Sequence, residues 1–188
     1  MEPVTLHTER LVLSVPTADD IDAIFAACQD ELIQRYTTVP SPYERRHAAG
    51  FVDLVAGWWD SGSETTWAIR SGGELAGMVG LHRLGSGTGE IGYWMVPAHR
   101  GRGLLSEACR AVIDWAFASD GLGLARIEWR AVAGNSASAH VARALGFRYE
   151  GLLRRGISSP RGHEDGWVAG LLPEDDRTPQ PWPEPNPE

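Results

Sequence analysis

The chain contains no lysine, because all 17 of its basic residues are arginine. Nucleotide hydrolases of the P-loop class need a lysine in their Gly-x-x-x-x-Gly-Lys-Ser/Thr loop, so that class is excluded. Cysteine is also scarce: Cys28 and Cys109 stand far apart, and neither belongs to a Cys-x-x-Cys or Cys/His ligand spacing. A disulfide framework and a structural metal site are therefore not expected.

Long apolar runs are missing as well. No segment approaches the roughly 18 consecutive apolar residues of a transmembrane helix, and the first residues show no basic stretch followed by an apolar one. The formal net charge is −8, whereas a nucleic-acid-binding protein needs a basic surface for the phosphates. We therefore expect a cytoplasmic protein that binds neither nucleic acid nor membrane.

What is present is a chain of 188 residues, 43% of them hydrophobic, which suffices for one sizeable core. We predict a single domain over residues 1–175. Residues 176–188 are rich in proline and acidic side chains, a composition typical of a disordered tail.

Apolar periodicity and turn signals predict a mixed α/β (α+β) fold with a mostly antiparallel sheet. Three antiparallel strands should precede a central strand–turn–helix unit. The strands are expected at 10–15, 66–70, 75–84, 90–96, 126–132, 147–155 and 166–172, and the helices at 21–28, 42–59, 103–118 and 136–145.

The turn between the strand at 90–96 and the helix at 103–118 favours the binding of a pyrophosphate. Gly101 and Gly103 allow backbone N–H groups to point inward with no Cβ in the way, and the helix N-terminus adds unpaired donors and partial positive charge. An ordinary strand–turn–helix with solvated arginines fits the glycines equally well. A Rossmann dinucleotide site does not, because the preceding strands are antiparallel and a third glycine is missing.

A second group of polar residues follows the strand at 126–132. Asn135 is suited to cap the next helix, and Gly146 is suited to the left-handed position after its end. If this helix splays the strand away from its neighbour, Asn135 and Ser138 are exposed at a cleft beside the anion turn.

Five motifs occur in a fixed order: Leu6–Leu13 (Leu-x-Thr-x-Arg-Leu-x-Leu), Glu90–Val96, Arg100–Ala108, Asn135-x-x-Ser138 with Leu145–Phe147, and Leu171–Asp175. Together they resemble the GCN5-related N-acetyltransferase (GNAT) superfamily, and more narrowly its RimJ/RimL branch of ribosomal-protein N-terminal acetyltransferases. The resemblance covers about residues 6–175. It implies the GNAT acyl-CoA N-acyltransferase fold, whose central sheet is splayed in the middle and carries helices on both faces.

The resemblance further implies acetyl-CoA as the acyl donor and no metal. Pyrophosphate would lie on backbone amides of the turn, and the pantetheine arm would lie beside the end of the preceding strand, where one amide would stabilise the charge on the thioester oxygen. Leu105 departs from the glycine or alanine of many members. The residues implied are Met95 and Val96 for the pantetheine, Arg100, Gly101, Arg102, Gly103, Leu104, Leu105 and Ser106 for the pyrophosphate, and Asn135, Ser138 and Arg143 for the pantetheine, the thiol and the adenosine phosphate.

The chemistry needs a base, since a protonated amine must lose a proton before it attacks a thioester. The resemblance implies Glu90, which matches a strand glutamate that serves as base in some members. Ser138 would give a proton or hydrogen bond to the departing thiolate. Ile157 stands where other members of this branch have an acid, which leaves Glu150 and Asp165 as further candidates.

The acceptor pocket is expected in the variable parts of the chain, where aromatic side chains beside acids suit a cationic amine. For any one tryptophan there, filling the core or supporting a dimer is the favoured alternative. A protein N-terminus, an antibiotic amine, a polyamine and an amino acid all stay open as acceptors. The candidate residues are Trp58, Trp59, His82, Asp165 and Trp167.

The resemblance implies the transfer of an acetyl group from acetyl-CoA to a primary amine by direct attack in a ternary complex. The resemblance also implies a homodimer. Two alternatives stay open: a catalytically silent CoA-binding regulatory protein, and a transferase of a longer acyl group.

Overall fold

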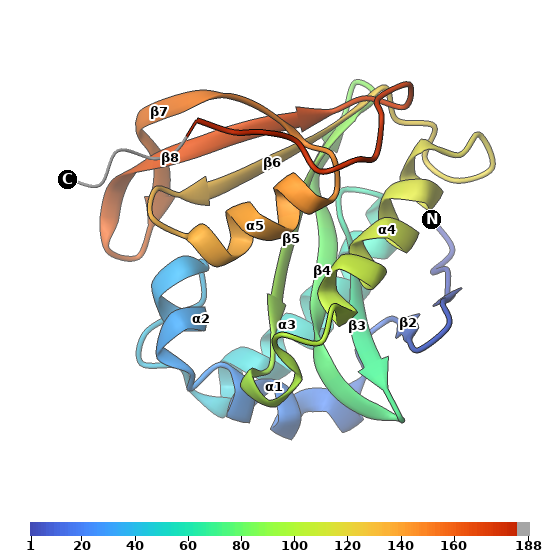
Figure 1. Cartoon of the computed structure of the whole chain (residues 1–188). Helices are drawn as coiled ribbons and strands as arrows, with labels where there is room; N and C mark the ends of the chain where they lie inside the picture. Colours follow the sequence, from blue (N-terminus) through green and yellow to red (C-terminus); the bar gives the residue numbers. More distant parts are fainter. Residues whose placement is uncertain (184–188) are drawn as a thin grey trace.

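The computed structural model describes residues 1–183. Eight strands form one sheet in the order β1-β2-β3-β4-β5-β6-β8-β7 (Figure 1). Every neighbouring pair is antiparallel except β5 and β6, which run parallel. The mixed architecture and the mostly antiparallel sheet confirm the predicted fold class.

The strands are β1 (Leu6–His7), β2 (Val12–Ser14), β3 (Thr65–Ser71), β4 (Glu74–Gly85), β5 (Thr88–Met95), β6 (Arg126–Val132), β7 (Arg148–Ser159) and β8 (Gly162–Leu171). The helices are α1 (Ile21–Ala27), α2 (Glu31–Tyr36), α3 (Arg45–Ser61), α4 (Leu104–Phe117) and α5 (Ser136–Ala144), with short 3₁₀ turns at Ala18–Asp20 and Pro97–His99. Of the helices within residues 1–183, none has both the length and the apolar character that crossing a bilayer requires.

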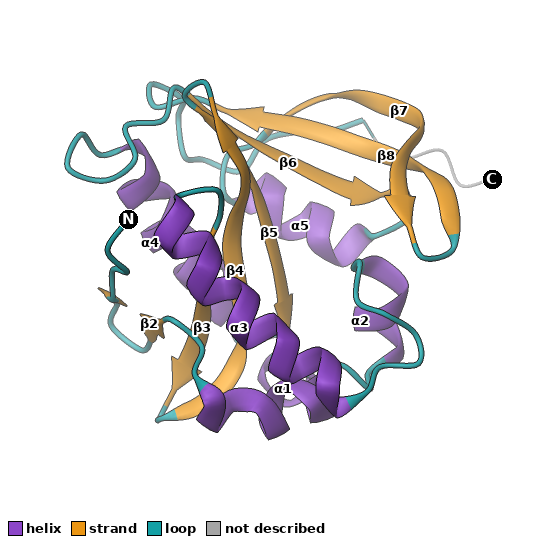
Figure 2. Ribbon diagram, turned by 180° about the vertical axis from the view of Figure 1, so that it is seen from behind, coloured by secondary structure: helices purple, strands orange, loops and turns teal. Residues whose placement is uncertain are grey.

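The central strands have two different faces, because successive side chains of a strand point to opposite sides. Trp67 of β3 and Val79 of β4 belong to the main core, which also takes buried residues from α4 and α5. Figure 2 shows α4 lying across these strands. Ala68, which follows Trp67, and Met78, which precedes Val79, point to the opposite face and belong to a smaller core with α1, α2 and α3. Farther along β4 and β5, this second face carries a cavity.

The sheet is splayed in its middle. β5 and β6 pair only from Thr88 opposite Arg126 to Ile91 opposite Trp129. Beyond this point the two strands diverge (Figure 1), and α5 follows the end of β6. Residues 92–95 of β5 therefore have one edge that is not covered by a neighbouring strand, as the GNAT resemblance implies.

The sequence signals missed α2. Asp30 caps this helix, since its Oδ1 accepts a hydrogen bond from the Ile33 amide at 3.0 Å. With only six residues, α2 is too short to display a clear apolar period. The helix expected over 42–59 instead begins at Arg45, after a capping box in which the Glu44 amide donates to His47 Nδ1 at 3.0 Å.

The expected disordered tail is described as far as residue 183. Trp182 lies against Trp129 and Tyr149, with ring centroids 5.3 and 5.7 Å away, and its Nε1 donates to the Phe147 carbonyl at 2.8 Å. A single large aromatic side chain thus anchors a proline-rich segment to the domain. The rest of the predicted tail, 184–188, lies outside the described residues.

Candidate active site

The anion turn lies between β5 and α4. Gly101 and Gly103 both adopt left-handed backbone angles, with φ of 71° and 74°, which glycine reaches at little cost. In the described part of the chain, the amides of residues 101–106 meet no hydrogen-bond acceptor; the Glu107 amide is the next to be paired, with the Gly103 carbonyl at 3.2 Å. The N-terminus of α4 adds partial positive charge. These free amides fit the pyrophosphate of acetyl-CoA.

Arg100 supports the turn with its side chain rather than its amide. The Arg100 amide donates to the Pro97 carbonyl at 3.2 Å, so the free amides begin at Gly101. The guanidinium lies 2.7 Å from Asp30 Oδ1 and donates to the Met95 carbonyl at 3.2 Å. This hydrogen bond from Arg100 lowers the pKa of Asp30. The N-cap of α2 is thereby tied to the anion turn.

The N-terminal motif braces the same turn. Thr8 Oγ1 donates to Glu107 Oε1 at 2.6 Å, and Arg10 Nε donates to Oε2 at 2.6 Å. Arg10 Nη1 also donates to the Arg102 carbonyl at 3.1 Å. Burial alone would raise the pKa of Glu107, but the hydrogen bonds from Thr8 and Arg10 outweigh it and lower the pKa. Sequence reasoning recognised the motif as a family feature and missed its partner, which is 97 residues away.

The open edge of β5 presents one of the two amides expected at the thioester. The Val96 amide, one residue past the end of β5, donates to the Ala76 carbonyl of β4 at 2.8 Å, so it is already used. Because successive N–H groups of a strand point to opposite sides, the Met95 amide faces the gap between β5 and β6. Of the two, Met95 is therefore the residue whose amide can stabilise charge on a thioester oxygen.

Two of the three residues expected on α5 lie at the gap. Asn135 caps the helix by accepting from the Ser138 amide at 3.2 Å. The Ser138 hydroxyl accepts from Trp129 Nε1 at 3.0 Å and donates to the Tyr93 hydroxyl at 3.2 Å. Arg143 instead points to the tail, since its Nε donates to the Gln180 carbonyl at 3.3 Å.

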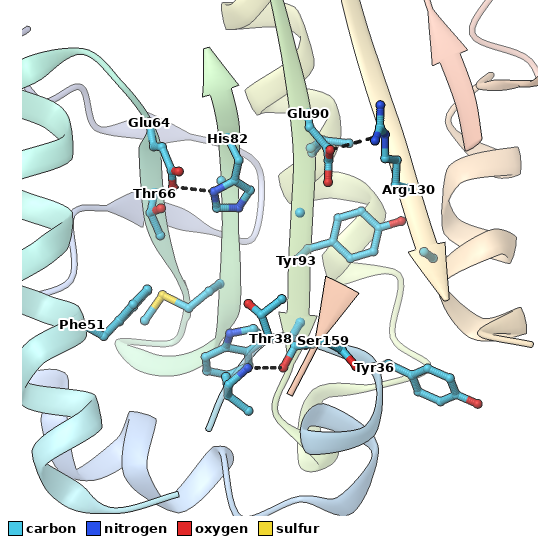
Figure 3. Close-up of a pocket in the computed structure, with 18 of the residues that line it drawn as sticks. Tyr36, Thr38, Phe51, Glu64, Thr66, His82, Glu90, Tyr93, Arg130 and Ser159 are labelled. Atoms are coloured by element: carbon cyan, nitrogen blue, oxygen red, sulfur yellow. Dashed lines mark hydrogen bonds and ion pairs between the residues drawn. The ribbon is translucent and has the colours of Figure 1, made fainter. Parts of the chain in front are cut away.

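A cavity of about 870 Å³ opens on the sheet face that also carries α2 and α3. Its floor consists of side chains and glycines from β3, β4 and β5, and α3 contributes Phe51 to its wall (Figure 3). Trp58 of α3 also lines the cavity. Tyr93, Asn135 and Ser138 also line it. The cavity therefore reaches the gap between β5 and β6, where the thioester is expected.

Glu90 is a half-buried carboxylate in this cavity. Its Oε2 lies 2.9 Å from Arg83 Nη1 and 3.7 Å from Arg130 Nε, yet neither arginine has the geometry of a hydrogen bond to that oxygen. Burial raises the pKa of Glu90, and the charges of Arg83 and Arg130 oppose that rise only in part. A cavity carboxylate with a raised pKa accepts a proton more readily than an exposed carboxylate does.

The cavity also contains a histidine–carboxylate pair. His82 Nδ1 lies 2.7 Å from Glu64 Oε2 (Figure 3). Glu64 was not among the residues expected from the sequence. It stands 18 residues before His82, and only the pairing of β3 with β4 brings the two side chains together.

Trp59 does not line the cavity, and the expectation that it contacts the acceptor is corrected. The side chain is only 1% exposed, donates from Nε1 to the Thr66 carbonyl at 3.2 Å, and packs edge-on against Trp67. Neighbouring residues of a helix point about 100° apart, so Trp58 faces the cavity while Trp59 fills the core.

Asp165 and Trp167, on β8, also do not line the cavity. Asp165 Oδ1 accepts from the Arg155 amide at 2.7 Å, and Trp167 is buried opposite Ala131. Glu150 pairs with Arg126 at 2.6 Å outside the cavity. These side chains hold the β6–β8–β7 part of the sheet together, so the acceptor and base roles considered for them are corrected.

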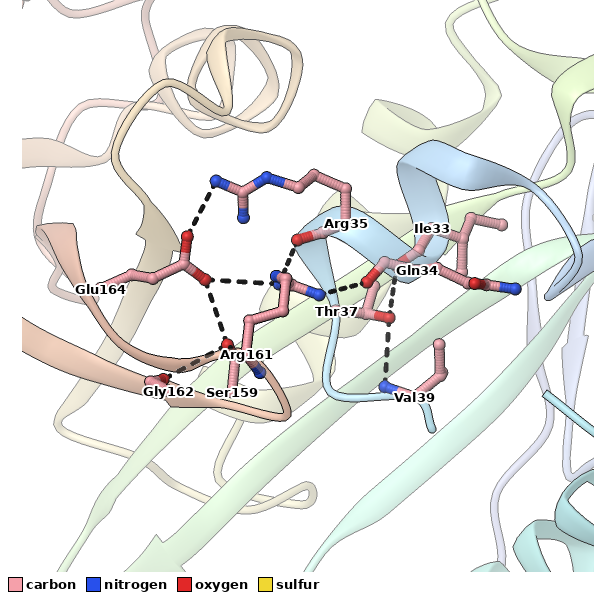
Figure 4. A network of polar contacts seen from close by, with 9 residues as sticks. All are labelled: Ile33, Gln34, Arg35, Thr37, Val39, Ser159, Arg161, Gly162 and Glu164. Carbon is pink, nitrogen blue, oxygen red and sulfur yellow. Dashed lines mark hydrogen bonds and ion pairs between the residues drawn. The ribbon is translucent and has the colours of Figure 1, made fainter. Parts of the chain in front are cut away.

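One side of the cavity is closed by the hairpin between β7 and β8. Arg161 donates from Nη1 to the Gln34 carbonyl at 2.7 Å and from Nη2 to the Arg35 carbonyl, at the end of α2 (Figure 4). Glu164 pairs with Arg35 at 2.8 Å and accepts from Ser159 Oγ at 3.1 Å. The hairpin is thus fastened to α2 by charged groups on both sides.

The comparisons with known proteins agree with this geometry. The family model of the acetyltransferase (GNAT) domain matches residues 10–148. The chain is 32% identical over 154 residues to the uncharacterized N-acetyltransferase YoaA of Bacillus subtilis (strain 168), covering 80% of this chain and 86% of that protein. It is 36% identical over 84 residues to the ribosomal-protein-serine acetyltransferase of Escherichia coli (strain K12), covering 44% and 46%. The structure of Mycobacterium smegmatis RimJ in complex with CoA-disulfide matches with a TM-score of 0.82 at 22% identity, covering 93% of this chain and 91% of that one.

Proposed function

The chain belongs to the GNAT acetyltransferase family, and we propose that it acetylates the α-amine of a protein or peptide N-terminus within a ternary complex. It is an N-acetyltransferase, and acetyl-CoA is its donor. The observation that carries the proposal is the continuity of one cavity from the β7–β8 hairpin to the gap beside β5. The name of the E. coli relative, a ribosomal-protein-serine acetyltransferase, supports this class of amine.

The donor is proposed to bind along the anion turn and the open edge of β5. The amides of residues 101–106 would hold the pyrophosphate, and the Met95 amide would face the thioester oxygen. Asn135 and Ser138 would lie beside the pantetheine and the thiol. When bound, acetyl-CoA supplies the activated acetyl group; the protein supplies position, charge and proton acceptors.

Glu90 is proposed as a base for the incoming amine. An α-amine has an ordinary pKa near 8 and is mostly protonated at neutral pH, so it must lose a proton before it can attack. Glu90 lies in the acceptor cavity and has a raised pKa. Ser138 is proposed to turn its hydroxyl proton from Tyr93 to the departing thiolate and donate a hydrogen bond to the sulfur.

The test is a thiol-release assay against a panel of amines. The panel contains peptides with a free N-terminal serine, the same peptides with a blocked N-terminus, a polyamine, an aminoglycoside and free amino acids. We expect CoA release with the free peptides and none with their blocked counterparts. Release with the polyamine or the aminoglycoside alone would contradict the proposed acceptor.

We further propose that the enzyme acts as a homodimer in the cytoplasm, which is supported by the family resemblance. Light scattering on the purified protein measures the mass of the particle directly. A monomer across the working concentration range would contradict the dimer. Recovery of the protein with the membrane or extracellular fraction would contradict the proposed location.

A further inference from the structure

We infer that His82 accepts one of the two protons that the acceptor amine loses, with Glu64 as its positioning residue. The inference rests on the proposed function of the cavity. It is carried by the position of the imidazole, by the contact that orients it, and by the free nitrogen that it presents to the cavity.

The His82 imidazole lies on the cavity floor, over a pair of glycines. Gly80 of β4 and Gly92 of β5 are direct partners in the sheet. A Cβ placed on Gly92 would lie 2.9 Å from His82 Nε2, and one placed on Gly80 would lie 3.4 Å from its Cε1. The two glycines therefore make the room that the ring occupies. In the register of the sheet, His82 stands opposite Glu90. Its ring, however, extends over Gly92, which is the first residue of the open edge at 92–95.

Glu64 decides which nitrogen of the ring carries the proton. An ionised carboxylate only accepts hydrogen bonds, so the 2.7 Å contact with Glu64 Oε2 places the proton on Nδ1. Nε2 then presents a lone pair. Within residues 1–183, Nε2 has no hydrogen-bond partner, and His82 lines the cavity.

A second feature of the floor is an unpaired polar group close to the imidazole. Thr66, which also lines the cavity, has a buried hydroxyl with no hydrogen-bond partner among the described residues. A Cβ on Gly80 would come within 2.9 Å of that hydroxyl, so Thr66 Oγ1 and the imidazole lie over the same glycine. A buried hydroxyl without a partner is costly unless a ligand satisfies it. If the Thr66 side chain turns toward the cavity, an amine that donates to His82 Nε2 can also donate to its hydroxyl.

The proton balance of the reaction requires more than one transfer from the amine. A bond forms between the amine nitrogen and the acetyl carbon, and the bond between that carbon and sulfur breaks. An ammonium acceptor gives up two protons in this exchange; one ends on the thiolate and the other passes to solvent. Glu90 is proposed for one of these protons, and His82 Nε2 takes the other. The Glu64 carboxylate then stabilises the imidazolium that forms.

Substitutions at three residues, His82, Gly92 and Glu64, test the pair, with His7→Gln as the control. His7 is exposed on β1 and does not line the cavity. We expect His82→Gln to lower kcat about 10²- to 10⁴-fold, the usual contribution of general acid–base catalysis, with the KM for acetyl-CoA and the calorimetric Kd for CoA unchanged. Gly92→Ala should lower kcat about 10²-fold because its Cβ displaces Nε2, although both members of the pair are still present. Each rate is measured with the amine of the panel above that is acetylated fastest.

Two further readouts separate a catalytic role from a structural one. His82→Ala should regain activity with added substituted imidazoles, in the order of their basicity. Independently of turnover, ¹H–¹⁵N spectra should show the neutral His82 ring with its proton on Nδ1 in the wild type. In Glu64→Gln they should show a mixture of the two neutral tautomers, with the proton on Nδ1 or on Nε2. Glu64→Gln should also lower kcat with no effect on CoA binding.

The outcomes are distinguishable. An active wild type together with a His82→Gln enzyme that keeps the wild-type kcat overturns the assignment of His82 and leaves the proposed function standing. A wild type that binds CoA and acetylates no amine of the panel overturns both.

Discussion

The substitution Gly103→Ala tests the anion turn with little steric change. Gly103 has a φ of 74°, and a Cβ there would lie 3.7 Å from Arg10 Nη2, an ordinary contact. The cost of the alanine is therefore conformational, about 1–2 kcal/mol for an L-residue in the left-handed region. If the turn of the variant relaxes to another conformation to avoid this strain, CoA binding must restore the left-handed conformation at the same free-energy cost. At 1.4 kcal/mol per tenfold, the Kd for CoA should rise about 5- to 30-fold.

Gly72→Ala is the matched control. Gly72 has a φ of 62° at the tip of the β3–β4 hairpin, and a Cβ there would meet nothing within 4 Å. The Gly72→Ala protein should lose about as much stability as the Gly103→Ala protein, and its CoA binding should be unchanged. Gly103→Asn should bind CoA better than Gly103→Ala, because asparagine tolerates left-handed angles.

The assay is calorimetric titration with CoA, with thermal unfolding measured on each variant. If Gly103→Ala binds CoA as tightly as Gly72→Ala at equal losses of stability, the amides of this turn do not hold the ligand. That result would refute the reasoning from left-handed glycine to pyrophosphate binding.

Three further predictions concern charge and access. Glu90→Gln should lower kcat/KM about 10²- to 10⁴-fold while leaving the Kd for CoA unchanged; a normal rate would contradict the role of Glu90 as a base. The same substitution should raise Tm, because burial disfavours the ionised carboxylate, and a lower Tm would contradict the raised pKa. Arg161→Ala removes the fastening of the hairpin to α2, so the KM for the acceptor should rise about three- to tenfold with CoA affinity intact; equal effects on both ligands would contradict this role. Asp30 and Glu107 have lowered pKa values, so their stabilisation is complete above their ordinary pKa values, about 4, and is lost as the pH falls through the lowered ones. Thermal unfolding of the wild type should therefore lose Tm below about pH 4, and Asp30→Asn should flatten that dependence.

Local features of the sequence predicted most of the fold and the backbone geometry of the anion turn. Glycines at 101 and 103, the cap at Asn135 and the left-handed Gly146 depend on their own backbone geometry, so they can be recognised without knowledge of distant residues. The strands of the central sheet are long enough to show their pattern, whereas the six residues of α2 are not.

The acceptor side of the site depends on contacts between distant residues. The pairing of Glu64 with His82 follows from the register of β3 and β4, and the position of Glu90 beside His82 follows from that of β4 and β5. Trp58 and Trp59 are identical in type and adjacent in sequence, and only the orientation of α3 against the sheet separates a cavity residue from a core residue. Composition alone holds no signal for that difference.

The most direct test of the central claim is a crystal structure of the enzyme with CoA. We expect the pyrophosphate on the amides of residues 101–106, the pantetheine along the edge of β5 at Met95, and the sulfur opening into the cavity that contains Glu90 and His82. A CoA molecule whose thiol ends outside this cavity would contradict the assignment of the acceptor site and of both proton acceptors.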